Sequence, residues 1–220
     1  MIESKARSGA ALRAGGIGCA VAVLLPVLLI GGVFLIFSIE RATPEGYPDV
    51  KPESMARRVT GYSKGAFAAL GLDRTLQSNV YDMRKGDENT LDSDFCYPDG
   101  LESITDQAEE GAYRLYHRWS VGKVAPREGS SALRSLRDHL TSTGWRITES
   151  GVSEQRHERT LKAERDGGYT IALTWEADRR RLSGGSSAPC ATNPGWKESD
   201  GRYAEPSVGR PPVLTGRASK

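Results

Sequence analysis

The sequence contains few of the residues that most often carry catalysis or bind metals. There are three histidines and three cysteines among 220 residues. His117, His139 and His157 show no H-E-x-x-H pattern or other close ligand spacing, so a zinc site is not expected. We predict no catalytic residues, no metal-binding residues, no cofactor and no cofactor-binding residues.

The three histidines differ in their predicted surroundings. His117 falls on the apolar side of an alternating pattern that predicts a β-strand, whereas His139 and His157 fall among polar residues. A nucleophilic serine or cysteine needs a base such as histidine held beside it, and we assign none of the three histidines to that role. We interpret His117 as a core residue satisfied by a neighbour, and the other two as surface residues.

An excess of charge of either sign is also lacking. The chain has 30 Lys and Arg residues against 28 Asp and Glu residues. Residues 1–16 hold three of the basic and one of the acidic side chains, which leaves 27 of each over residues 17–220. A balanced surface gives no broad attraction for nucleic acid or for an anionic membrane surface, so no nucleic-acid partner is expected.

Long hydrophobic runs are absent except for one, which extends without a charge from Ile17 to Ile39. A helix of this length spans about 34 Å, enough to cross a hydrocarbon core of about 30 Å. We predict a transmembrane helix over residues 17–39, with the lipid bilayer as its partner. A cleaved signal peptide is the alternative, although its apolar region usually has only about 7–15 residues.

Flanking charge predicts the orientation of this helix. The basic leader, residues 1–16, should stay on the cytoplasmic side, because positively charged flanks are retained there. The prediction is a single-pass protein of the cell membrane with a cytoplasmic N-terminus and an extracellular C-terminal domain. Ala14, Gly18 and Ala22 recur every fourth residue, a spacing of small residues that would also allow a homodimer.

Cysteine usage agrees with an exported domain. Only Cys96 and Cys190 lie outside the predicted membrane segment, and disulfides persist in an oxidising compartment. We predict a disulfide between them, with two unpaired thiols as the alternative.

Composition divides the rest of the chain into three parts. Residues 40–52 contain three prolines and a glycine and predict a stalk linker. Residues 53–195 predict an α+β domain. Residues 196–220 are rich in Gly, Pro, Ser and Arg, so we expect a disordered tail.

Periodicity within the α+β domain predicts two helices and about four strands. One helix follows Pro52 and ends at Gly71, and a second begins at Ser130 or Ser131 and ends at Gly144. The predicted strands are residues 113–121, 145–152, 157–165 and 169–176, with a short last strand over residues 180–183. The expected fold is α+β: one transmembrane helix and a small exterior domain, with helices on one face of a mainly antiparallel sheet of about four strands.

Residues 82–110 contain ten acids against Arg84 and Lys85. Asp92 could begin a calcium loop, but Tyr97 stands where the EF-hand needs glycine and Ser103 where it needs glutamate. We therefore expect a solvated loop fixed by Cys96. A further hypothesis is that this acidic loop lies across the basic run of residues 179–181.

These elements resemble the uncharacterised single-pass exported membrane proteins of GC-rich Gram-positive bacteria. The similarity is carried by the anchor, by Trp119, by the segment LRDHLTSTGWRI within residues 133–147, and by the hairpin and Pro-Cys that follow. The resemblance covers most of residues 17–196. It implies no activity and no functional residues.

We expect a membrane-anchored, non-enzymatic module that binds a protein partner at the cell envelope through its sheet surface or its acidic loop. The alternative is a cell-envelope enzyme that uses carboxylates of residues 82–110, as paired carboxylates do in glycoside hydrolysis. Such an enzyme would need a cleft holding two carboxylates.

Overall fold

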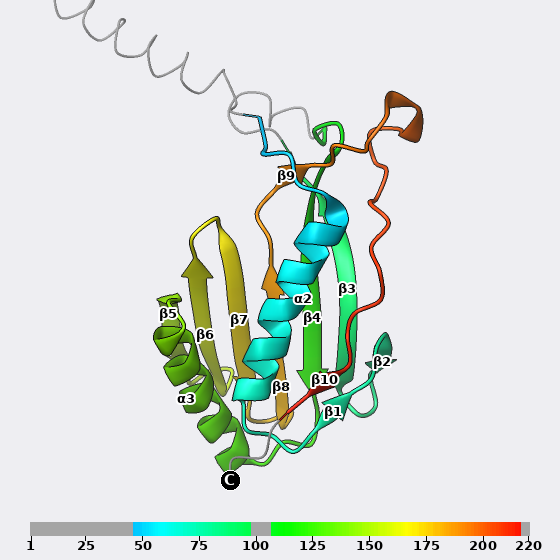
Figure 1. Cartoon of the computed structure of the whole chain (residues 1–220). Coiled ribbons are helices and arrows are strands. Elements are labelled where there is room, and N and C mark those ends of the chain that lie inside the picture. The colour runs from blue at the N-terminus through cyan, green and yellow to red at the C-terminus, as the bar shows by residue number, and fades with distance from the viewer. Residues whose placement is uncertain (1–45, 98–106, 217–220) are drawn as a thin grey trace, which may run out of the picture. The chain divides into compact units, whose positions relative to one another are not determined.

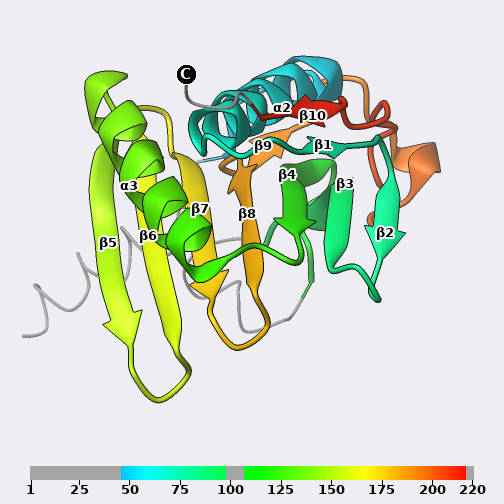
Figure 2. The same cartoon turned by 90° about the horizontal axis from the view of Figure 1, so that it is seen from below.

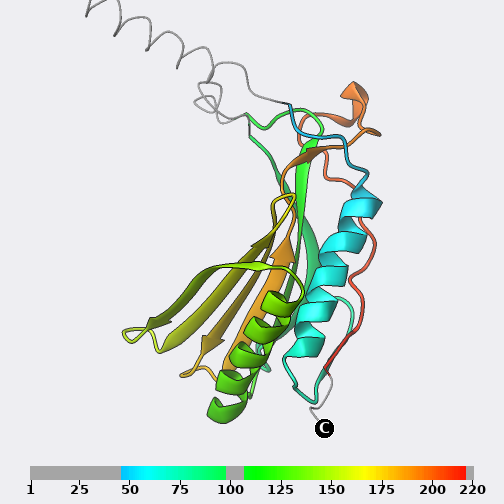
Figure 3. The same cartoon turned by 60° about the vertical axis from the view of Figure 1, so that its left-hand side comes forward.

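The computed structural model describes residues 46–97 and 107–216, which belong to one compact unit. An antiparallel sheet of eight strands forms one layer, and helices α2 and α3 form a second layer on one face of it (Figure 1 and Figure 3). The predicted fold, with helices on a sheet of about four strands, is wrong, because the domain is mostly sheet and its main sheet has eight strands. The prediction missed the strands that lack a clear apolar alternation.

The elements have the following bounds. The helices are α2 (Pro52–Ala69) and α3 (Pro126–Ser142), with a short 3₁₀ turn at Glu198–Asp200. The strands are β1 (Thr75–Leu76), β2 (Val80–Asp82), β3 (Asp87–Phe95), β4 (Ala112–Val121), β5 (Arg146–Ser153), β6 (Glu158–Arg165), β7 (Tyr169–Glu176), β8 (Arg181–Ser187), β9 (Ala191–Thr192) and β10 (Leu214–Thr215).

The strand order shows which strands form the centre of the sheet and which form its edges. The order is β2-β3-β4-β8-β7-β6-β5, with β9 paired beside the first residues of β4 and with β1 and β10 forming a separate pair. After β4 the chain crosses through α3 to the far edge at β5. It then returns by hairpins through β6 and β7 until β8 pairs with β4. The central strands β4 and β8 are therefore distant in sequence but adjacent in the sheet.

Helix α2 forms as its sequence predicts. Pro52 occupies the first turn, where its missing N–H is not needed, and Gly71, which follows the helix, has a φ of 71°. Met55, Val59 and Phe67 share the buried side. This helix lies against β4, β8 and β7.

Helix α3 begins earlier than predicted. Pro126 occupies its first turn, and the N–H of Ala125 donates to Oε2 of Glu128 at 2.8 Å, so the expected caps at residues 130–131 lie inside the helix. Leu136 and Leu140 are buried. Gly129 faces Trp175, where a Cβ atom would lie 2.5 Å from the indole ring.

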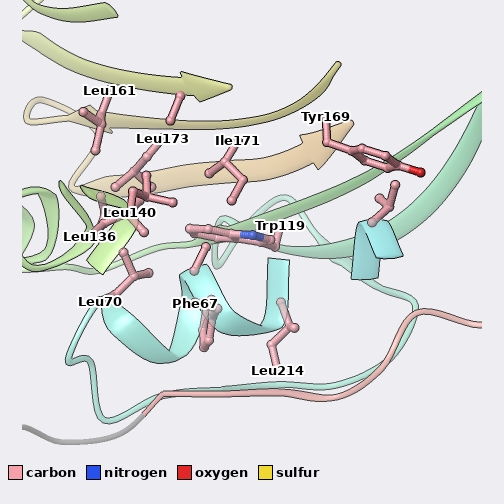
Figure 4. Packing of buried hydrophobic residues seen from close by; sticks show 14 of the residues in the cluster. Phe67, Leu70, Trp119, Leu136, Leu140, Leu161, Tyr169, Ile171, Leu173 and Leu214 are labelled. Carbon is pink, nitrogen blue, oxygen red and sulfur yellow. The ribbon is translucent and has the colours of Figure 1, made fainter. Parts of the chain in front are cut away.

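The core lies between the two layers. Figure 4 shows Trp119, Ile171 and Leu173 of the sheet facing Phe67 and neighbouring helix residues. Trp119 is 1% exposed, and its ring meets Phe67 edge-on with centroids 5.2 Å apart. Figure 2 shows both helices on the same side of the sheet.

The acidic segment is not the predicted solvated loop, because residues 87–95 form β3. Its acids alternate with Asn89 and Leu91, which turn toward the helices. Asp94 forms an ion pair with Arg114 of β4. Cross-strand pairs of opposite charge stabilise a strand that its hydropathy alone does not reveal. Residues 98–106 lie outside the described residues.

The predicted disordered tail is wrong over residues 196–216. Strand β10 pairs with β1, and Leu214 is fully buried. Nη1 of Arg202 donates to the carbonyl oxygen of Ala108 at 2.9 Å, and Tyr203 packs edge-on against Phe95. These separate contacts order residues 196–216 although the segment has no periodic apolar pattern.

Part of the predicted stalk belongs to the domain. Residues 46–51 run beside β9, where the N–H of Val50 donates to the carbonyl oxygen of Thr192 at 3.0 Å. The N–H of Thr192 in turn donates to the carbonyl oxygen of Pro48 at 3.0 Å. Residues 40–45 lie outside the described residues.

In the part of the chain that the structure describes, no helix combines the length and the apolar character needed to cross a membrane. The described residues therefore do not bear out the predicted single-pass localisation. The prediction depended on the hydropathy of residues 17–39 alone. Those residues and the leader, residues 1–16, lie outside the described residues.

The predicted disulfide is confirmed. Cys96 and Cys190 are bonded, with their Cα atoms 5.9 Å apart. Tyr113 of β4 pairs with Phe95 of β3 on one side and with Ala191 of β9 on the other. Cys96 follows Phe95 in the chain, and Cys190 precedes Ala191. The bond therefore ties together the two strands beside the first residues of β4.

Replacing both Cys96 and Cys190 by serine should lower the free energy of unfolding by about 4–5 kcal/mol, because the bond closes a loop of about 95 residues in the unfolded chain. Urea denaturation of the oxidised protein and of the variant measures the difference. Equal stability would contradict this role.

Leu214→Ala should lower the free energy of unfolding by about 2–5 kcal/mol, because it leaves a cavity beneath the C-terminal segment. Its neighbour Val213 is 43% exposed, so Val213→Ala is the matched control and should change stability by less than about 0.5 kcal/mol. Similar urea midpoints for the two variants would show that the segment does not stabilise the domain.

Candidate functional site

The open face of the sheet is the surface opposite α2 and α3. In its central row, Arg118 of β4 pairs with Gly185 of β8, and Gly185 pairs with Ala172 of β7. Alternate residues of a strand point to opposite faces, so these three belong to the open face. Two small residues stand side by side at the centre of this row, and the surface is hollowed there.

We call this depression the sheet-face hollow. Its volume is about 370 Å³, within the range of small-molecule pockets. Side chains of the open face that line it are Tyr116, Arg118, Thr170, Ala172, Thr174, Ser183 and Ser187, and the backbone of residues 184–186 completes it.

The glycines of β8 are required by close approaches within the sheet. A Cβ atom at Gly184 would lie 2.5 Å from the ring of Trp119 on the core side. A Cβ atom at Gly185 would lie 2.2 Å from the carbonyl oxygen of His117. Glycine inside a strand marks such approaches. The hollow is therefore built into the packing of β8 against β4.

Hydroxyl groups border the small-residue row on both sides. Thr174 pairs with Ser183 on one side, and Thr170 pairs with Ser187 on the other. The hydroxyl oxygens of Thr170 and Ser187 are 2.7 Å apart. Because a hydroxyl donates once and accepts twice, these groups retain capacity for a ligand.

An aromatic ring forms one wall of the hollow. The guanidinium carbon of Arg118 lies 5.0 Å from the ring centroid of Tyr116, within cation–π range. Nη2 of Arg118 also lies 3.0 Å from Oδ2 of Asp92. The guanidinium of Arg118 therefore contacts both the ring of Tyr116 and the carboxylate of Asp92.

Among the described residues of the segment 82–110, the carboxylates proposed for an enzyme do not converge on a cleft, and Asp99, Glu102 and Asp106 lie outside the described residues. Asp92 and Asp94 point from β3 to arginines of β4, and Glu110 pairs with Arg202. No carboxylate lines the sheet-face hollow. Among residues 46–97 and 107–216, no group of three or more His, Cys, Asp or Glu side chains could hold a metal ion.

In the described part of the chain, no acid of the segment 82–110 forms an ion pair with residues 179–181, and only residues 83–86 of that segment lie beside them. Arg179 and Arg181 instead form ion pairs with Glu176, at 3.2 and 2.7 Å. Acids of β3 pair instead with arginines of β4, because the strand register places Asp94 directly across from Arg114 and Asp92 diagonally from Arg118.

His117 lies in the core, as predicted. It is fully buried, and its Nε2 lies 2.7 Å from Oδ1 of Asn89. Nδ2 of Asn89 donates to the carbonyl oxygens of Gln77 and Pro212, both at 2.9 Å. The Asn89 side chain thus connects β4 to the C-terminal segment. Since Asn89 Oδ1 can only accept, we infer that Nε2 of His117 carries the proton.

Burial lowers the pKa of His117 to about 4, although the negative charge of Asp92 acts in the opposite direction. Nδ1 of His117 has no hydrogen-bond partner among the described residues. His117 is therefore held neutral by the core. His157, at the surface, lies 2.9 Å from a carboxylate oxygen of Asp178, and His139 is partly exposed on α3.

Residues 61–65 read Gly-Tyr-Ser-Lys-Gly and match the G-x-S-x-G pattern, a motif that the sequence interpretation overlooked. In hydrolases this serine occupies a sharp turn between a strand and a helix. Ser63 instead lies inside α2, fully buried, with its hydroxyl 2.9 Å from that of Ser186. The serine joins the helix to the sheet, and the match carries no catalytic meaning.

The sheet-face hollow itself was missed by the sequence interpretation. The sequence predicts a last strand over residues 180–183 only, but β8 continues through Gly184-Gly185-Ser186 to Ser187. A run of small residues directly after the apolar Leu182 was the available signal, because it can mark a strand against which other groups pack closely.

Comparison with known proteins gives no family assignment: no family model, no curated protein and no solved structure matches this chain. The resemblance to exported proteins of unknown function therefore stays a prediction.

Lowering the pH from 7 to 4.5 should destabilise the protein through His117 by about 2.5 kcal/mol. The unfolded chain binds a proton near the ordinary pKa of 6.5, whereas the folded chain resists protonation until about pH 4. The stability that the neutral form of His117 contributes is complete above pH 6.5 and is lost as the pH falls toward 4. Urea denaturation at several pH values measures it.

His117→Gln should remove this part of the pH dependence, since an amide can still donate to Asn89 but does not titrate in this range. His139→Gln changes a partly exposed histidine and should keep the pH dependence of the unmodified protein. Parallel pH profiles for His117→Gln and the unmodified protein would count against the assignment.

Proposed function

We propose that this protein is a non-enzymatic binding module whose sheet-face hollow holds a neutral, hydroxyl-rich ligand of the saccharide class. The observation that carries the proposal is the lining of the hollow: hydroxyl groups on two sides, small residues as the floor and an aromatic wall. Saccharides present hydroxyl groups at their edges and C–H groups on their ring faces, which suits such a lining.

The polar groups around the hollow support hydrogen bonding in both directions. Thr174 can donate or accept, and the bonded pair of Thr170 and Ser187 retains one hydroxyl proton for a ligand. The hydroxyl of Ser183 donates to Oε1 of Glu176 at 3.4 Å and can still accept. The floor at Ala172 and Gly185 lets a flat ring approach the sheet closely. The ring of Tyr116 offers an apolar surface with a polar end, a combination that aromatic residues commonly supply in binding sites.

Binding is favoured over catalysis by the placement of charge. Glycoside hydrolysis needs two carboxylates facing one another across a cleft. The sheet-face hollow has none among its lining residues, and Asp92 is engaged by Arg118 at its edge. The hollow is therefore suited to hold a ligand without transforming it.

Tyr116→Ala should weaken saccharide binding about five- to tenfold, because it removes the aromatic wall. Isothermal titration calorimetry of the full chain with cellotetraose, maltotetraose and chitotetraose is the measurement. Tyr81→Ala is the matched control, since Tyr81 is 66% exposed on β2 and does not line the hollow. Ala172→Leu, which fills the floor, should also weaken binding.

The proposal fails if none of the three tetrasaccharides binds. It fails equally if Tyr81→Ala weakens binding as much as Tyr116→Ala. Hydrolysis products found after long incubation would instead favour the enzymatic alternative.

A further inference from the structure

A second hollow lies at one end of the sheet, where three loops meet. The loops are the turn between β2 and β3, the loop between β4 and α3, and the turn between β7 and β8. Figure 2 views this end of the sheet. The hollow has a volume of about 350 Å³ and is lined by residues 83–86, residues 122–123 and residues 179–181. We call these residues the basic loop cluster.

Hydrogen bonds between the loops fix their relative positions. The hydroxyl of Ser120 donates to the carbonyl oxygen of Gly86 at 2.7 Å, and the N–H of Gly122 donates to Oδ1 of Asp87 at 3.2 Å. On the other side, the N–H of Val124 donates to the carbonyl oxygen of Arg180 at 2.9 Å. The loop after β4 is thus connected to both turns, and the cluster is preorganised.

The backbone around this hollow is closely packed and partly strained. A Cβ atom at Gly122 would lie 1.7 Å from the carbonyl oxygen of Lys85, so no other residue fits there without movement. Lys123 and Arg180 have φ values of 56° and 50°, in the left-handed region that most residues avoid. Strained backbone of this kind concentrates at functional sites.

Positive charge in the cluster exceeds what the nearby acids neutralise. The lining includes six cationic side chains: Arg84, Lys85, Lys123, Arg179, Arg180 and Arg181. The acids bonded to the cluster are Asp82, Asp87 and Glu176, whereas Asp178 of the same turn is bonded to His157. Within the described residues, no carboxylate lies within 4 Å of the charged nitrogens of Arg84, Lys123 or Arg180. The hollow therefore carries an uncompensated charge of about +3.

We propose that the basic loop cluster is a binding site for a phosphate-bearing anion of diphosphate size. Arginine and lysine are the side chains that bind phosphate oxygens, through charge-assisted hydrogen bonds. Cations from three separate loops surround the hollow, and its volume exceeds that of a single phosphate. A diphosphate group can contact several of these cations at once, which a monovalent anion cannot.

This site is distinct from the sheet-face hollow, and the two have no lining residue in common. The anion site lies at an end of the strands, and the other lies at the centre of the open face. Each proposal can therefore fail without affecting the other.

The test is isothermal titration calorimetry of the full chain with pyrophosphate at low ionic strength. Arg84→Gln combined with Lys123→Gln removes two unpaired cations and should weaken binding at least about tenfold. Arg134→Gln combined with Arg137→Gln makes the same change of net charge at exposed positions of α3 and should leave the affinity unchanged. Added salt should weaken binding by the unmodified chain.

A second ligand distinguishes the source of the phosphate. Equal affinities for ADP and pyrophosphate indicate that an esterified diphosphate is accepted, whereas binding of pyrophosphate alone indicates the free anion. Either result supports the site. The proposal is overturned if pyrophosphate does not bind, or if the control pair weakens binding as much as the cluster pair.

If the cluster variant does not fold, amide chemical shifts of the unmodified chain replace it. Pyrophosphate should then shift the signals of residues 83–86, 123 and 179–181. Shifts confined to other residues would overturn the proposal. Saccharide binding should be the same with and without pyrophosphate.

Discussion

The packing of Trp119 against Gly184 is the constraint on which the centre of the structure depends. The indole fills the space that any side chain at residue 184 would need, and it also meets Phe67 of α2 edge-on. The helix layer therefore rests on an aromatic group that only a glycine in β8 can admit. A large buried aromatic contributes more contact area than any other core residue, so its position sets that of its neighbours.

A second close approach, at the next residue of β8, shapes the opposite face of the sheet. Gly185 follows Gly184 in β8 and lies against the backbone of His117. Gly185 pairs with Ala172 of β7, so the open face has no bulky side chain at these two residues. The close approach of β8 to the backbone of β4 at Gly185, together with the small side chain of Ala172, thus leaves the hollow on the open side.

Ion pairs and hydrogen bonds attach the polar edges of the domain to this centre. Strand β3 is bound to β4 by pairs such as Arg118 with Asp92, while the Asn89 side chain reaches from β3 to the C-terminal segment. At the end of the sheet, hydrogen bonds from Ser120 and Val124 hold the basic loop cluster together. Polar segments with little apolar content are therefore ordered by specific contacts.

The sequence by itself determined the elements whose side chains follow a regular period. Helix α2, the hairpin of β6 and β7, the burial of His117 and the disulfide of Cys96 and Cys190 are all visible in it. Each depends on spacing within a short segment or on a residue type with few alternatives. The start of α3 was misplaced because serines at residues 130–131 suit a helix cap as well as a helix interior.

Only the tertiary structure decided how the polar segments are used. Strand β3 is ordered by arginines that lie on β4, and β10 is ordered by β1, which is more than 130 residues away in sequence. Both hollows are assembled from loops or strands that are distant along the chain. Local sequence cannot show such sites, because the groups that form them meet only after the sheet has brought β8 beside β4.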